Sequence, residues 1–180
     1  MQNLNTYNNF YFVGIGGIGM SALARYFHAA GKNVLGYDKT ETKLTTELQN
    51  EGISISFEDV VDEKFSELNK ENTLVIYTPA IKVLGILDYF NQNGFEVLKR
   101  AKVLGLITEN TECISVAGTH GKTTTSSLVA HLCKVANLPF SGFLGGIAEN
   151  YKSNFIYNGT KISVLEADEY DRSFLNLSPD

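Results

Sequence analysis

The sequence predicts an α/β protein in which most strands are parallel. Short apolar runs alternate with longer amphipathic stretches over the 180 residues, a pattern typical of strand–helix–strand units. Two glycine-rich segments, at residues 14–19 and 118–121, each lie between an apolar run and a helical pattern. The first indicates a Rossmann-like parallel sheet, and the second indicates the start of a P-loop-type α/β domain.

The first module is expected to alternate strands and helices up to about Arg100. Its apolar runs have the length and composition of buried strands, and they lie at residues 10–16, 32–38, 53–57, 73–81 and 95–100. Helical patterns separate most of these runs, at residues 20–30, 44–50 and 84–94. Strands linked in this way pair in parallel, with the helices on the faces of the sheet.

The second module restarts the same order after a helical pattern at residues 101–110. A strand is expected at residues 111–118, a helix from about Thr123 to Val135, a turn at "GFLGGI" (142–147) and a strand at residues 161–169. We therefore predict domains at residues 1–105 and 106–180. We count two strands and one long helix after Gly118, too few to cover both faces of a parallel sheet, so we expect this module to be incomplete.

Composition excludes several classes of partner. The hydrophobic content of 43% is that of a globular protein, and the formal charge of −5 with a pI near 5.2 leaves no basic excess to attract nucleic acid or an anionic membrane. No basic segment precedes the first apolar stretch, so we expect no export signal, no membrane anchor and a cytoplasmic protein. Cys113 and Cys133 lack C-x-x-C spacing, which favours buried, reduced thiols.

The first glycine segment has the G-x-G-x-x-G spacing of a dinucleotide-binding turn. Gly14, Gly16 and Gly19 follow a strand and open a helix, and Asp38 ends the next strand about twenty residues later. Such glycines let the backbone approach a diphosphate at the helix N-terminus, and the acid binds the ribose or base. Three interpretations stay open: a tight turn without a ligand, an NAD or FAD site of an oxidoreductase or sensor, and a site for a nucleotide that is part of a substrate.

The second glycine segment, "VAGTHGKTTTSS", is close to a phosphate-binding loop but shorter than the strict G-x-x-x-x-G-K-[ST] pattern. Gly118 and Gly121 flank a compact turn before a helix whose first N–H groups would face phosphates. Lys122 supplies an ammonium group for the β- and γ-phosphates, and Thr123 a hydroxyl for Mg²⁺. The alternative is a Gly/Thr turn with an exposed lysine. His120 alone indicates only proximity to the phosphates.

An acidic segment, "SVLEADEYDRSF", follows the last expected strand. Glu166 comes directly after its apolar core, at the carboxyl end where open α/β sheets bind ligands. Mg²⁺ prefers oxygen ligands and needs only one or two carboxylates. Glu166 is therefore the candidate metal ligand, and Asp168, Glu169 and Asp171 are candidates for supporting contacts; a solvated acidic turn is the alternative.

These motifs together resemble those of the ATP-dependent Mur ligases of peptidoglycan synthesis. The resemblance rests on "GTHGKTTT", "EADEYDRSFLNLSP", "VGIGGIGMSALAR" and "YTPAI", and covers residues 10–179. It implies a Rossmann-like domain for the UDP part of a substrate, a central ATPase domain and a third domain for the amino acid. "SFLNLSP" is most similar to the members that join L-alanine to UDP-N-acetylmuramate. Members that attach a recycled tripeptide are the close alternative, and a non-catalytic nucleotide-binding module is another.

The resemblance also implies roles for individual residues. Lys122 would be the catalytic residue, and Thr123 and Glu166 would hold Mg²⁺. The ATP phosphates would be bound by Gly118, Thr119, His120, Gly121, Lys122, Thr123 and Thr124. The UDP diphosphate would face Gly14, Ile15, Gly16, Gly17, Ile18 and Gly19, with Asp38 at the nucleoside end and Thr78, Pro79, Ala80 and Ile81 across the cleft. The family's third domain and a later histidine metal ligand lie outside these 180 residues, so we expect no turnover from this chain alone.

Overall fold

The computed structural model describes residues 3–61, 65, 68–81, 84–167, 175, 177 and 179. The chain divides into two compact units, Asn3–Arg100 and Ala101–Asp180, which are described separately below. Helix α4 (Arg100–Thr108) contains both this division and the domain limit predicted at residue 105.

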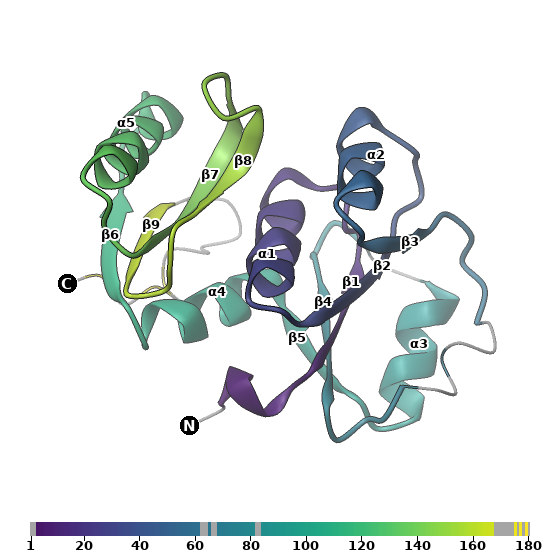
Figure 1. Cartoon of the computed structure of the whole chain (residues 1–180). Helices are drawn as coiled ribbons and strands as arrows, with labels where there is room; N and C mark the ends of the chain where they lie inside the picture. The colour runs from purple at the N-terminus through teal and green to yellow at the C-terminus, as the bar shows by residue number, and fades with distance from the viewer. Residues whose placement is uncertain are drawn as a thin grey trace. The chain divides into compact units, whose positions relative to one another are not determined.

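The first unit is built on a five-stranded parallel sheet, which confirms the predicted Rossmann-like fold (Figure 1). Its strands are β1 (Asn9–Val13), β2 (Asn33–Tyr37), β3 (Ser54–Ser56), β4 (Thr73–Tyr77) and β5 (Glu96–Lys99). The order is β3-β2-β1-β4-β5, and every neighbouring pair is parallel. The chain therefore reverses its direction of winding between β1 and β4, the place where open α/β sheets bind ligands at their carboxyl edge.

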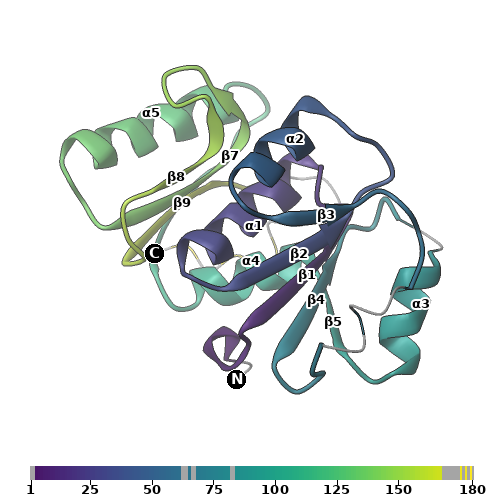
Figure 2. The ribbon, with the colours of Figure 1, turned by 45° about the vertical axis from the view of Figure 1, so that its right-hand side comes forward.

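The helices of this unit cover both faces of the sheet (Figure 2). They are α1 (Ile18–Ala29), α2 (Lys43–Asn50) and α3 (Gly85–Gln92), and a 3-10 turn, η1 (Leu4–Thr6), precedes β1. Alternate side chains of β1 point to opposite faces: Phe10 stacks on Phe27 of α1 at 3.7 Å, whereas Tyr11 and Val13 pack with Phe90 of α3. Burial on both faces explains the nearly unbroken apolar run of this strand.

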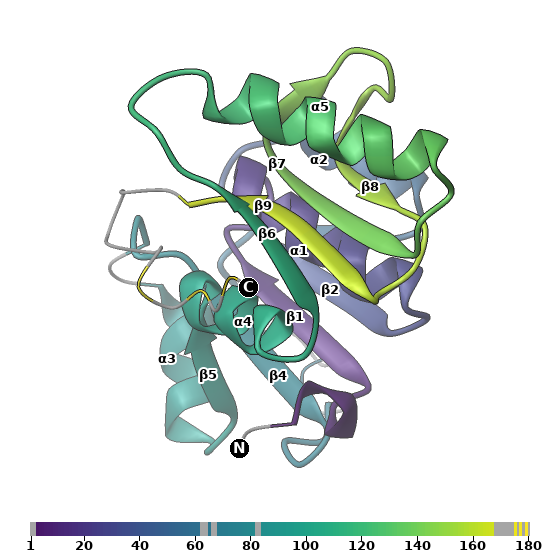
Figure 3. The same ribbon diagram turned by 90° about the vertical axis from the view of Figure 1, so that its left-hand side faces the viewer.

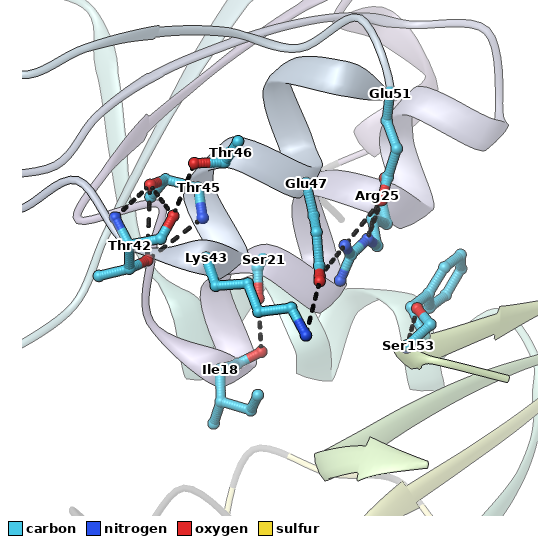
Figure 4. Close-up of polar contacts among 11 residues, drawn as sticks. Ile18, Ser21, Arg25, Thr42, Lys43, Thr45, Thr46, Glu47, Glu51 and Ser153 are labelled. Atoms are coloured by element: carbon cyan, nitrogen blue, oxygen red, sulfur yellow. Dashed lines mark hydrogen bonds and ion pairs between the residues drawn. The ribbon is translucent and has the colours of Figure 1, made fainter. Parts of the chain in front are cut away.

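Polar contacts connect α1 to α2 and close the first turn of α2 (Figure 4). Arg25 on α1 is only 6% exposed, and its guanidinium forms an ion pair with Glu51 at 2.7 Å and a longer one with Glu47 at 3.6 Å. Thr42 caps α2, because its side chain accepts a hydrogen bond from the Thr45 N–H while the Thr45 hydroxyl accepts one from the Thr42 N–H. The ion pairs of Arg25 fix α2 beside α1, the helix that follows the first glycine loop.

The second unit is built on a four-stranded mixed sheet with one long helix on its face (Figure 3). Its strands are β6 (Glu112–Val116), β7 (Phe140–Ala148), β8 (Ser153–Tyr157) and β9 (Ile162–Glu166), in the order β6-β9-β7-β8. The β6–β9 and β7–β9 pairs are parallel and β7–β8 is antiparallel. Helix α5 (Lys122–Val135) buries Ala130 and Cys133 against this sheet.

The prediction for residues 142–147 was wrong. "GFLGGI" is part of β7, not a turn, and β8 was not predicted; β7, β8 and β9 all follow Gly118, three strands rather than two. The glycines are needed for close approach: a Cβ at Gly142 would lie 3.2 Å from Cβ of Ala130 in α5, and one at Gly145 would lie 2.6 Å from Oε2 of Glu166. Glycine in a strand here marks neighbouring side chains that come close to the backbone.

Two further expectations concern cysteines and membranes. Cys113 and Cys133 are both buried and form no disulfide, as predicted, and burial raises the pKa of the Cys133 thiol. Within the residues that the structure describes, every helix is too short or too polar to cross a lipid bilayer.

Candidate functional site

The second glycine loop leads from β6 into the N-terminus of α5. Gly121 caps the helix with φ of 76°, a left-handed conformation that favours glycine, and its carbonyl accepts the first helical hydrogen bond from the Thr125 N–H at 2.9 Å. Gly118 has φ of 151°. Thr119, His120 and Thr124 are exposed around this turn. The first N–H groups of a helix lack carbonyl partners within it, so this end is suited to bind an anion.

Lys122 is the first residue of α5, and its side chain folds back over the loop. Its amine donates a hydrogen bond to the Gly118 carbonyl at 2.7 Å. The positive charge is therefore held beside the backbone that would surround the phosphates. This is where a lysine must lie to neutralise the β- and γ-phosphates of a nucleotide bound at the helix N-terminus.

Glu166 ends β9 and reaches the first turns of α5. One carboxylate oxygen, Oε2, accepts a hydrogen bond from the Thr123 hydroxyl at 3.2 Å. The other, Oε1, accepts hydrogen bonds from the Ser126 hydroxyl at 3.1 Å and from the Gly145 N–H at 2.8 Å. The structure thus brings together Thr123 and Glu166, the two residues expected to hold a metal ion although they are 43 positions apart.

This pair of oxygen atoms fits a magnesium ion. Adjacent ligands of an octahedral Mg²⁺, each at about 2.1 Å, lie about 3 Å apart. The hydroxyl of Thr123 and the nearer oxygen of Glu166 are 3.2 Å apart, and both are the hard oxygen donors that Mg²⁺ prefers. Among the described residues, no three His, Cys, Asp or Glu side chains cluster to form a metal site. Asp168, Glu169 and Asp171 lie outside the described residues.

Sequence reasoning missed two contacts of Glu166. Ser126 lies three residues after Thr123 and so shares its face of α5, a signal that helical spacing carries. Gly145 lies in the segment taken for a turn, and its role depends on β7 pairing with β9, which local sequence does not show. The missed strand and the missed contact therefore have one origin.

The first glycine loop connects β1 to α1 in the other unit. Gly14 has φ of 86°, and its N–H and that of Ile15 donate to the Tyr37 carbonyl at 2.7 and 3.0 Å. A Cβ at Gly14 would lie 2.7 Å from Cδ1 of Ile81. Gly17 caps α1, so the loop leads the chain directly into the helix N-terminus. The backbone angle favours glycine at position 14, and a Cβ there would also displace the end of the Ile81 side chain.

The Asp38 carboxylate stabilises this loop by accepting hydrogen bonds from backbone N–H groups. Its Oδ2 accepts a hydrogen bond from the Gly16 N–H at 2.7 Å, and its Oδ1 accepts one from the Thr40 N–H at 3.1 Å. A Cβ at Gly16 would lie 2.8 Å from Oδ2, so glycine at that position allows the contact. The expected contact of Asp38 with a nucleoside stays a prediction beside this loop-binding role.

A cavity of about 510 Å³ opens beside the first loop. It is lined by Gly14, Gly17, Tyr37, Asp38, Lys39, Thr78, Ala80, Ile81 and Leu84. The loop and the segment after β4, both predicted to face a UDP group, thus form one cavity. Of the other residues predicted there, Ile15 is fully buried against Gly36, Gly19 makes room for Arg100, Ile18 is 39% exposed at the start of α1, and Pro79 lies in the turn after β4.

Tyr37 and Lys39 in this lining were not predicted. They flank Asp38, so proximity to a predicted residue was the available signal. Burial, with added repulsion from Asp59 and Asp38, raises the pKa of Tyr37 and keeps its hydroxyl protonated. Lys39 is exposed and brings a positive charge to the cavity, as a site for a diphosphate requires.

Comparison with known proteins places these sites in a family. Residues 9–111 match the model of the Mur ligase family, catalytic domain. The chain is 55% identical to a UDP-N-acetylmuramate–L-alanine ligase of Flavobacterium psychrophilum and 50% identical to one of Christiangramia forsetii, over 99% of this chain and 40% of each relative. The chain thus spans about 40% of the length of these curated relatives.

Solved structures resemble it over almost the whole chain. The UDP-N-acetylmuramate-alanine ligase of Thermotoga maritima superposes with a TM-score of 0.82 at 33% identity, covering 95% of this chain and 39% of that one. A Neisseria ligase that joins a tripeptide to UDP-N-acetylmuramate gives a TM-score of 0.76 at 26% identity, covering 92% of this chain and 54% of that one.

Proposed function

The chain belongs to the Mur ligase family, and on this premise we propose that it serves in the ATP-dependent joining of L-alanine to UDP-N-acetylmuramate during peptidoglycan synthesis. The second unit would bind ATP with Mg²⁺, and the first would bind the UDP part of the sugar substrate. The relatives at 50–55% identity support the choice of L-alanine.

The observation that carries the proposal is the meeting of Lys122, Thr123 and Glu166 at the head of α5. The lysine amine lies on the loop, 2.7 Å from the Gly118 carbonyl, and the threonine hydroxyl lies 3.2 Å from the glutamate. A cation, a hydroxyl and a carboxylate around a helix N-terminus match the charges of a magnesium-bound triphosphate. The alternative of a Gly/Thr turn with an unrelated lysine accounts for none of the contacts of Glu166.

The chemistry requires activation of a carboxylate, which is a poor electrophile at neutral pH. An oxygen of the muramoyl carboxylate would attack the γ-phosphorus of ATP, releasing ADP and forming an acyl phosphate. The amine of L-alanine would then attack the acyl carbon, lose a proton and expel phosphate, leaving an amide. Lys122 would neutralise charge on the transferring phosphoryl group, and the loop would orient it.

Thr123 and Glu166 would hold the metal ion in this scheme. Mg²⁺ would supply charge neutralisation for the β- and γ-phosphates. Ser126 and the Gly145 N–H keep the glutamate carboxylate directed toward Thr123. The chain itself contributes binding and orientation, with no covalent step on the protein.

The cavity of the first unit supports a nucleoside diphosphate as the second ligand. Its glycine backbone approaches from the N-terminus of α1, and Lys39 adds a positive charge. Asp38 already accepts hydrogen bonds from Gly16 and Thr40, so it shapes the loop. A UDP-sugar fits such a cavity as a bound substrate, whereas a redox role would need a hydride-transfer site that the sequence does not indicate.

Two measurements test the proposal. Calorimetry of the 180-residue chain with UDP-N-acetylmuramate, Mg-ATP and NAD in turn should give heats for the first two ligands; binding of NAD alone would favour an oxidoreductase or sensor. A chimera in which residues 1–180 replace the matching part of the Flavobacterium psychrophilum relative should release phosphate with L-alanine. A chimera that binds UDP-N-acetylmuramate and Mg-ATP but releases no phosphate with L-alanine would contradict the proposal.

A further inference from the structure

The carboxylate of Glu166 is held unequally at its two oxygens. Oε1 has two donors, the Ser126 hydroxyl at 3.1 Å and the Gly145 N–H at 2.8 Å, and these come from a helix and a strand. Oε2 accepts a hydrogen bond from the Thr123 hydroxyl at 3.2 Å, and this hydroxyl is itself a candidate metal ligand. Two hydrogen bonds thus hold Oε1 in place, and Oε2 is directed at the proposed metal position beside Thr123.

Ser126 is an unusual choice for its position in α5. It is 0% exposed and lies in the helix interior, where alanine has the higher helix propensity and buries no polar atom. A buried hydroxyl costs free energy unless it finds a partner. Its two acceptors are the Thr123 carbonyl and Oε1 of Glu166, both at 3.1 Å, and its single hydrogen serves one of them at a time.

We infer that Ser126 is a positioning residue for the metal-binding carboxylate: with the Gly145 N–H it fixes Oε1 of Glu166, so that the metal is bound through Oε2 alone. This inference rests on the proposed role of Glu166 as a metal ligand. A glutamate side chain loses rotamer freedom when it binds a metal. A carboxylate already held in place loses less, because the hydrogen bonds have ordered it before the metal arrives.

The first test uses the metal-free chain. In the wild-type chain, hydrogen exchange of the Gly145 amide reports its hydrogen bond to Glu166, measured by NMR. Ser126→Ala should make this exchange several-fold faster, because the carboxylate is then held by one donor fewer. Ser127→Ala removes the same hydroxyl from the next position of α5 and should leave the exchange unchanged. Equal exchange in both variants contradicts the inference without any nucleotide being present.

The second test measures binding of Mn²⁺ with ATP by electron paramagnetic resonance. Ser126→Ala should lower the Mn²⁺ affinity about 10-fold, the lower end of the loss typical when a partner of a metal ligand is removed, since Gly145 still donates. Ser127→Ala should keep the wild-type affinity, and Glu166→Gln should lose binding altogether. A purely structural Ser126 would lower the melting temperature and leave the affinity unchanged, which overturns the inference.

These results separate the inference from the proposed function. If Glu166→Gln loses Mn²⁺ binding while Ser126→Ala matches Ser127→Ala, only the inference fails. If Glu166→Gln binds Mn²⁺ as tightly as the wild-type chain, or if the wild-type chain binds none, the proposed metal site fails. The metal part of the inference then fails with it. The exchange of the Gly145 amide then still decides whether Ser126 holds the carboxylate.

Discussion

The two glycine loops have the same sequence order but use their acidic partners in opposite ways. Each follows a parallel strand and opens a helix, α1 after Gly17 and α5 after Gly121. In the first loop the carboxylate of Asp38 bonds the loop's own backbone, at the Gly16 N–H. In the second, Glu166 comes from a neighbouring strand and accepts from hydroxyl groups on the helix.

This difference separates the two proposed phosphate sites. An acid tied to the loop backbone has its charge already engaged, so the first unit offers the N-terminus of α1 and Lys39 to a diphosphate. An acid beside a threonine hydroxyl, with a lysine on the same turn, offers oxygen ligands to a metal and a cation to a triphosphate. On the proposed function, one strand–glycine loop–helix segment would bind a substrate and the other an activating nucleotide.

The largest expected effect comes from removing the cation of the second loop. Lys122→Ala in the chimera should lower L-alanine-dependent phosphate release by about 10²–10³, because a preorganised charge contact to the transferring phosphoryl group is lost. Binding of UDP-N-acetylmuramate, measured by calorimetry, should be unchanged, since the first loop uses other residues.

Lys134→Ala is the matched control for this substitution. Lys134 lies near the other end of α5, and its amine donates to the Tyr157 carbonyl at the end of β8 and to Oδ1 of Asn158, at 3.4 and 3.5 Å. It should keep the wild-type rate. Equal rates of phosphate release for the Lys122 and Lys134 variants would show that the charge of Lys122 does not contribute to the reaction. The two loops would then not differ in this respect.

Alanine substitutions of the two left-handed glycines should separate the loops by their surroundings. Gly14 and Gly121 have φ of 86° and 76°, so alanine at either costs about 1–2 kcal/mol of backbone strain. A Cβ at Gly14 would also lie 2.7 Å from Cδ1 of Ile81, whereas in the described part of the chain a Cβ at Gly121 has open space beyond its own neighbours and helix backbone. Gly14→Ala should therefore lower the melting temperature more than Gly121→Ala, as measured by thermal unfolding of the chain.

Calorimetry with UDP-N-acetylmuramate completes the test of these two variants. Gly14→Ala should weaken binding, because its Cβ enters the lining of the cavity, and Gly121→Ala should not. Equal destabilisation by both variants would mean that the residues around Gly14 shift at no cost to make room for a Cβ. The close contact with Ile81 would then not distinguish the first loop from the second.

Much of this arrangement could be predicted because it depends on short-range spacing. Lys122 and Thr123 follow Gly121 directly, and Glu166 follows the apolar core of a strand. The sequence therefore indicated both which residues could form the site and where in the predicted elements they lie. The parallel order of the first sheet followed from alternating strands and helices, because parallel pairs need crossovers. Ser126 could have been found by extending the same helical spacing by one turn.

The contacts that escaped prediction depend on strand order. Gly145 meets Glu166 only because β7 lies beside β9, and residues 142–147 contain three glycines that locally indicate a turn. The glycines instead respond to α5 and Glu166, which reach them from distant parts of the chain. Likewise the hydrogen bond from the Gly16 N–H to Asp38 escaped prediction, because the conformation of the loop sets it. The contact of Asp38 with a nucleoside stays a prediction.

The smallest expected effect concerns Tyr37, whose carbonyl accepts hydrogen bonds from the Gly14 and Ile15 N–H groups of the first loop. Burial first, and then repulsion from Asp59 and Asp38, raises the pKa of its hydroxyl above that of the unfolded chain. The unfolded chain then loses this proton at a lower pH than the folded one, so the stabilising contribution present below pH 10 declines as pH rises above it. The slope from this single proton is at most about 1.4 kcal/mol per pH unit. Tyr37→Phe should therefore flatten the fall in unfolding free energy above pH 10, measured by urea denaturation. Identical pH profiles would show that the hydroxyl titrates alike in both states, and that burial beside the first loop does not affect its charge.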